Sequence, residues 1–224
     1  YFTSFFAFAG GIIMLLFVGD GPYRKRSGGF KWNAIGIIFK SKRLRQASLG
    51  YFGHMWELYA FWAFVPLILS TFLSKNPTLS FNVPLWSFII IAVGGLACVF
   101  SGYLSLTYKT KRVAFTALLL SCLCCLISPF VFEWSSQYLF LGFLLFWGIV
   151  VIADSPLFST LVAQNAIPKL KGTALTIVNC IGFSITIISI QLINYVATIW
   201  SPSYIFMLLA IGPILGLIAL YKKT

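Results

Sequence analysis

Charged side chains are scarce in this sequence. Only 9% of the 224 residues are Asp, Glu, Lys or Arg, whereas a soluble domain usually carries about 25%. Hydrophobic residues make up 60% of the chain, and they occur in long uninterrupted blocks. These features exclude an ordinary soluble domain and indicate an integral membrane protein.

Metal ligands and the signatures of hydrolytic enzymes are also lacking. His54 is the only histidine, and no cysteine spacing suits zinc, so we expect no metal and no cofactor. The five cysteines lie inside apolar blocks, where free thiols serve as small apolar side chains: Cys98, Cys122, Cys124, Cys125 and Cys180. No Gly-rich phosphate loop or Gly-x-Ser-x-Gly elbow is present, which argues against an ATP-driven pump and against a membrane hydrolase.

Long apolar blocks are what the chain does contain. A helix needs about 20 apolar residues to cross the hydrocarbon, and seven blocks approach or exceed that length: residues 1–18, 47–73, 85–107, 113–132, 138–163, 173–193 and 204–221. The first block has no upstream flank, so we interpret it as the last helix of a preceding unit. Residues 47–221 form a self-contained set of six helices, preceded by a basic connector at 19–46 and followed by a short tail at 222–224.

The basic residues set the orientation. Of the 16 Lys and Arg residues, all except Lys75 fall on alternate connectors and in the tail, and hence on one side of the membrane. This is the positive-inside pattern, which predicts a multi-pass protein of the cell membrane with a cytoplasmic C-terminus. It also accounts for the net charge of +12 without a nucleic-acid partner. Within the basic connector, residues 32–39 suit either a short interfacial helix or a flexible linker.

This arrangement resembles helices six to twelve of a twelve-helix major facilitator superfamily transporter. The second half of such a transporter is a six-helix bundle built from two inverted three-helix repeats. The resemblance covers the whole chain and implies an all-α membrane bundle. It also implies that the N-terminal half of the same transporter is a partner.

A connector after the third block supports the resemblance. Residues 102–112 are similar to the family's Gly-x-Leu-(small)-Asp-Arg-x-Gly-Arg-Lys-Arg loop. The matching positions are Gly102, Leu104, Ser105, Lys111 and Arg112. Leu106 and Lys109 replace the Asp and the second Gly of the motif. We expect Gly102 to permit close packing and the basic residues to anchor the cytoplasmic face.

Two acids lie inside the predicted spans and are the leading functional residues. An ionisable group there costs roughly 2.5–3.5 kcal/mol or more. Glu57 and Asp154 are predicted at matched depths, ~15 Å and ~14 Å from the cytoplasmic helix ends. In the family's fold, their helices lie beside the central cavity.

His54 is three residues from Glu57, so we expect the two side chains to share a helix face and to hydrogen-bond. Tyr51 extends that face. A His–Glu pair in a low dielectric can exchange protons near neutral pH. The pair therefore couples proton movement to transport, braces two helices, or contacts the substrate directly. We include Asn179 in this substrate or coupling set, although an interhelical hydrogen bond explains it adequately.

Asp154 precedes Ser155 and Pro156. Because proline removes a backbone donor, we expect a kink there that frees a carbonyl near Ile152. Such a break forms a transporter site in some folds and is a purely structural bend in others. Asp154 could instead cap the following helix segment.

The sequence thus predicts a secondary active transporter of a small solute, working by alternating access and coupled to protons. The alternative is a channel or a non-transporting multi-pass subunit. No Lys or Arg lies deep in a span, which favours a cation, a neutral polar solute or proton coupling over an anionic solute.

Overall fold

A computed structural model describes residues 1–19, 36, 39–134 and 136–221. The chain divides into two compact units, residues 1–30 and 31–224. In the first unit, α1 (Phe2–Phe17) is an apolar helix of 16 residues. Most of the predicted connector, including nearly all of the 32–39 segment, lies outside the described residues.

In the described part of the second unit, all regular secondary structure is helical. The helices are α3 (Lys42–Lys75), α4 (Val83–Thr107), α5 (Thr110–Val131), α6 (Gln137–Ala153), α7 (Ser155–Asn165), the short η1 (Pro168–Leu170), α8 (Lys171–Val196), α9 (Pro202–Ile205), η2 (Phe206–Ala210) and α10 (Ile211–Tyr221). Taken as continuous stretches, these give six helices that are long and apolar enough to cross a membrane. The predicted all-α membrane bundle is therefore confirmed.

Capping residues fix several helix starts. Ser41, Asn82 and Ser136 each accept a hydrogen bond from the backbone N–H three residues later, which satisfies a donor that has no partner within the helix. Because Ser41 caps α3, this helix begins at Lys42 and not at residue 47 as expected. Its first turn thus carries basic residues that the sequence analysis assigned to the connector.

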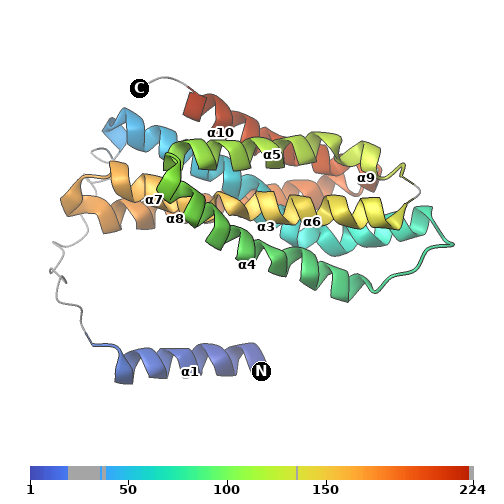
Figure 1. The fold of residues 1–224 in the computed structure, drawn as a ribbon, viewed down its shortest axis with the longest axis horizontal. Coiled ribbons are helices and arrows are strands. Elements are labelled where there is room, and N and C mark those ends of the chain that lie inside the picture. Colours follow the sequence, from blue (N-terminus) through green and yellow to red (C-terminus); the bar gives the residue numbers. More distant parts are fainter. Residues whose placement is uncertain (20–35, 37–38, 135, 222–224) are drawn as a thin grey trace. The chain divides into compact units, whose positions relative to one another are not determined.

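Short connectors make successive spans antiparallel, as Figure 1 shows for α3 to α10. The start of α3, the α4–α5 turn, the α7–α8 turn and the end of α10 consequently lie at one end of the bundle. Every described Lys and Arg except Lys75 belongs to this end, which we call the basic end. Trp86, Trp134 and Trp200 lie toward the other end, where amphipathic rings suit a membrane interface.

The core has two apolar clusters that meet at mid-depth. One contains Leu58, Phe61 and Trp147, and the other, nearer the basic end, contains Tyr51, Met55 and other buried residues. On α3, α5 and the α6–α7 stretch, the residues between the clusters are polar. These residues are His54, Glu57, Ser121 and Asp154. We call this buried layer the polar seam.

Glycines allow the closest helix crossings. Gly50 and Gly53 of α3 face Gly216 and Gly212 of α10, and a Cβ on Gly212 would come within 2.6 Å of the Gly53 carbonyl oxygen. Gly212 and Gly216 form a Gly-x-x-x-Gly pair, and both lie in close contact with α3. The packing role predicted for Gly102 is not confirmed, because a Cβ there would meet no described atom within 4 Å.

Gly148 provides a sharp test of this packing. A Cβ on Gly148 would collide with the backbone carbonyl oxygen of Ile90 on α4, and backbone cannot move aside as a flexible side chain can. We expect Gly148→Ala to destabilise the protein by about 1–3 kcal/mol, the usual range for overpacking, measured by thermal unfolding in detergent micelles.

Gly142→Ala is the matched control on the same helix. A Cβ on Gly142 meets nothing within 4 Å, so alanine's higher helix propensity should leave stability unchanged or raise it by up to about 1 kcal/mol. Equal unfolding temperatures for the two variants would contradict the tight α4–α6 crossing.

Candidate buried proton site

Glu57 lies near the middle of α3 and accepts hydrogen bonds from two neighbouring helices. Its Oε1 accepts from the Trp147 indole N–H at 2.8 Å and from the Cys125 thiol at 3.2 Å. Its Oε2 lies 2.9 Å from the Ser121 hydroxyl. The Glu57 side chain is buried, with 1% of the residue exposed. The three partners carry no formal charge, so hydrogen bonds alone offset the burial of this acid.

The Ser121 hydroxyl has two acceptors within reach but only one proton to donate. Its Oγ lies 2.9 Å from Glu57 Oε2 and 3.2 Å from the Leu118 carbonyl oxygen. If Glu57 is ionised, Ser121 donates to it. If Glu57 is protonated on Oε2, the carboxyl donates to Ser121, and Ser121 donates to Leu118. The geometry therefore supplies hydrogen bonds for both forms of the carboxyl.

His54 pairs with Asp154, which corrects the predicted hydrogen bond between His54 and Glu57. His54 Nδ1 and Asp154 Oδ1 are 2.8 Å apart, and both side chains are 1% exposed. Neither Asp154 oxygen has a hydrogen-bond partner among the described residues, so this is a close contact without hydrogen-bond alignment, and it is an ion pair when His54 is protonated. His54 Nε2 also lacks a hydrogen-bond partner there. Residues three apart share a helix face, but here a residue of another helix is the nearer partner.

Asp154 lies where the fourth span of the second unit is interrupted. α6 ends at Ala153 and α7 begins at Ser155, with Pro156 in its first turn, so the predicted break is confirmed. Pro156 leaves the Ile152 carbonyl without its usual donor, and the Cys98 thiol lies 3.6 Å from that oxygen. Asp154 occupies the N-cap position of α7 but makes no side-chain cap hydrogen bond, so the alternative capping role is wrong.

The other predicted site residues lie around this seam or away from it. Tyr51 is buried, with its ring centroid 6.1 Å from that of His54. Asn179 is half-buried on α8. Leu104 is exposed near the end of α4, whereas Lys111 and Arg112 lie in the first turn of α5. The structure brings Tyr51, His54, Glu57 and Asp154 together, and the motif residues lie at the basic end.

Three residues of the site were not predicted from the sequence: Trp147, Ser121 and Cys125. Two signals were available. Ser121 and Cys125 are four residues apart, so they lie on one face of their helix at mid-span. Trp147 is a tryptophan far from either membrane interface, and a buried indole N–H usually needs an acceptor. The description of Cys125 as a small apolar side chain was incomplete, because its thiol also donates to Glu57.

α8 exposes two rows of side chains outside its buried face, one largely polar and one aliphatic. The polar flank consists of Thr176, Cys180, Ser184, Gln191 and Asn194, which are all exposed, and the exposed Ile187 lies among them. The aliphatic flank consists of Ile177, Ile181, Ile185, Ile188 and Leu192, which are exposed or half-buried. The aliphatic flank suits lipid, whereas the polar flank suits water or another polar protein surface.

Comparison with known proteins agrees with this architecture. A family model described as Major Facilitator Superfamily matches residues 1–190. A comparison with curated proteins gave no match. Because the family match extends over most of the chain and the described helices include six apolar spans, the chain belongs to the Major Facilitator Superfamily.

Proposed function

We propose that this chain forms the C-terminal half of a secondary active transporter, which moves a small solute across the cell membrane by alternating access and is coupled to protons. The N-terminal half of the same transporter would complete the solute path. Membership of the superfamily supports membrane transport. The observation that carries proton coupling is Glu57, a buried acid with hydrogen-bond partners for both its ionised and its neutral form.

A coupling group must bind and release a proton without losing its place in the fold. Among the described residues no Lys or Arg pairs with Glu57, whose hydrogen-bond partners are an indole, a hydroxyl and a thiol. The His54–Asp154 pair begins one helical turn away and offers a second pair of titratable groups. Burial of all three residues means that protons reach them only after the helices move, as alternating access requires.

The same burial argues against direct substrate contact by these groups in this conformation. A solute in a central path would meet side chains on the surface of the bundle, and the polar flank of α8 supplies hydrogen-bonding groups there. The side-chain amides of Gln191 and Asn194 are exposed and can bind a neutral polar or cationic solute. We therefore assign the solute path to the polar flank and proton binding to the polar seam.

The test is transport by the full-length protein in liposomes that contain a pH-sensitive dye. A panel of neutral polar and cationic solutes is added outside the vesicles, and proton movement and solute uptake are recorded together. We expect one solute class to drive proton flux with saturable uptake and countertransport. A continuous, non-saturating flux would favour a channel, and saturable uptake without proton movement would overturn the coupling.

A further inference from the structure

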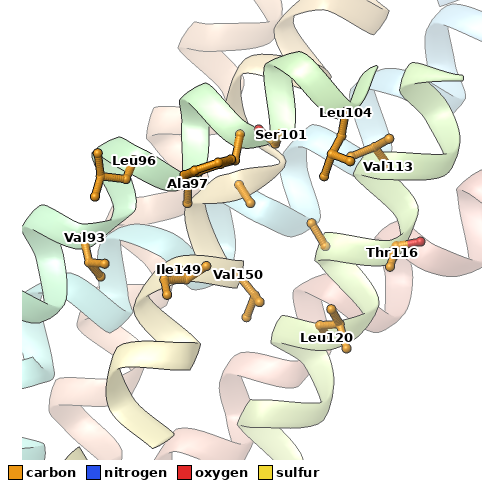
Figure 2. Close-up of a pocket in the computed structure, with 13 residues that line it drawn as sticks. Val93, Leu96, Ala97, Ser101, Leu104, Val113, Thr116, Leu120, Ile149 and Val150 are labelled. Atoms are coloured by element: carbon orange, nitrogen blue, oxygen red, sulfur yellow. The ribbon is translucent and has the colours of Figure 1, made fainter. Parts of the chain in front are cut away.

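An apolar groove lies between α4 and α5, with α6 along its floor. Its volume is about 430 Å³, within the roughly 300–1,000 Å³ that is usual for ligand sites. Figure 2 shows Val93, Leu96 and Leu104 of α4 and Leu120 of α5 along its sides, with Ile149 and Val150 of α6 between them. All lining residues are apolar except Ser101 and Thr116, and the Ser101 hydroxyl donates to the Cys98 carbonyl oxygen.

The length of the groove matches one leaflet of a bilayer. Along α4 the lining runs from Val93 to Leu104, which at 1.5 Å per residue is about 16 Å. The hydrocarbon core is about 30 Å thick, so one leaflet contributes about 15 Å. The groove runs from mid-membrane to the basic end, because Leu104 and Val113 border the α4–α5 turn.

Two cationic side chains, Lys109 and Arg112, lie where the groove reaches the basic end. Lys109 precedes Val113 by one turn of α5, and Arg112 precedes Thr116 by one turn, so each lies above a residue that lines the groove. Both cations are exposed, and neither has a carboxylate partner among the described residues. Basic groups beside apolar clefts at this depth favour anionic lipid headgroups.

We propose that this groove binds an anionic phospholipid of the leaflet at the basic end, with one acyl chain between α4 and α5 and the headgroup phosphate on Lys109 and Arg112. The inference rests on the membrane-spanning fold and does not depend on the transported solute. A second helix fits less well, because a helix about 10 Å wide and 16 Å long would fill roughly 1,250 Å³. A polar solute would find almost no hydrogen-bonding groups in the groove.

The test compares phosphatidylglycerol with phosphatidylcholine of identical acyl chains, using native mass spectrometry of the detergent-purified full-length protein. We expect the protein to retain phosphatidylglycerol preferentially. Lys109→Gln with Arg112→Gln should reduce that preference by about tenfold or more, since each cation near a headgroup contributes about 1 kcal/mol. The matched control is Lys169→Gln with Lys171→Gln, which removes two exposed cations of the same end that do not border the groove.

Two further measurements locate the lipid. Thr116 is exposed and lines the groove, so Thr116→Trp should fill it and reduce retention of both lipids, while thermal unfolding confirms that the variant is folded. Phosphatidylglycerol with a photoreactive group on its acyl chain should label Leu96 and Leu120 in preference to Ile181 and Ile188 of the aliphatic flank of α8. Three outcomes would overturn the proposal. The wild type could retain both lipids equally, or the Lys169 and Lys171 control could lose as much of the phosphatidylglycerol preference as the Lys109 and Arg112 variant. The third is no label in the groove, because another helix occupies it.

Discussion

Replacing His54 with leucine should destabilise the protein by about 3–5 kcal/mol, the usual effect of removing one partner from a buried ion pair. Asp154 would then retain a carboxyl group whose side chain is 1% exposed and which has lost its 2.8 Å contact. Asp154→Leu in the same chain should recover most of the loss, because an apolar pair of similar volume leaves no buried charge. Unfolding of the purified single and double variants in detergent micelles measures both effects.

The exposed pair at the opposite end of the bundle is the control. Lys75 Nζ and Glu133 Oε1 are also 2.8 Å apart, but their side chains are 37% and 69% exposed. Lys75→Ala should therefore change the stability by less than about 1 kcal/mol. If His54→Leu is no more harmful than Lys75→Ala, or if the His54 and Asp154 effects simply add, then the buried pair does not stabilise the fold as we infer.

The double variant also separates two roles of the pair. If His54 and Asp154 only brace α3 against the α6–α7 break, then leucine at both positions should preserve solute-driven proton flux. If they carry protons, the variant should fold and still lose that flux. Proton transfer needs groups that titrate, whereas bracing needs only well-packed contacts.

The spans could be predicted from sequence because the constraint on them is simple. A helix in hydrocarbon needs a long apolar run and satisfies its own backbone hydrogen bonds, so counting apolar residues located all six spans of the second unit. The helix ends were less predictable. Residues 42–46 form the first turns of α3 because Ser41 caps the helix, and basic side chains can extend from there toward water.

The buried acids of the site were predictable from the sequence, but their partners were not. Glu57 and Asp154 stand out because acids are rare inside apolar spans. Their partners depend on how helices cross, and helix spacing along the sequence does not encode that crossing. Trp147 lies 90 positions from Glu57 and donates a hydrogen bond to it. His54 is one turn from Glu57 on the same helix, but it contacts Asp154 instead.

The features on which the proposals rest lie in different parts of the second unit. The buried acids and His54 belong to the polar seam, exposed hydroxyl, thiol and amide groups lie on the polar flank of α8, and the groove between α4 and α5 is almost wholly apolar. This separation lets protonation change inside the bundle without placing a charge in lipid, where each would cost several kcal/mol, roughly 2.5–3.5 or more.

Glu57→Gln should abolish solute-driven proton flux, reducing it by about a hundredfold or more if one essential proton-transfer group is lost, while the protein remains folded. The glutamine oxygen can still accept from the Trp147 indole, and its amide can donate to the Ser121 hydroxyl, whose own proton then goes to the Leu118 carbonyl. The variant therefore copies the neutral form of Glu57 but cannot release a proton. The measurement is dye-reported proton flux in proteoliposomes, with an unfolding curve for the same preparation.

Solute countertransport separates coupling from a purely structural role. Exchange of solute across the membrane needs no net proton release, so Glu57→Gln should retain it if Glu57 is the coupling group. Loss of exchange together with lower stability would assign Glu57 a structural role instead. Glu133→Gln removes an exposed acid that pairs with Lys75 and should leave both fluxes unchanged. If Glu57→Gln behaves like Glu133→Gln and proton flux persists, the coupling site must lie elsewhere in the transporter.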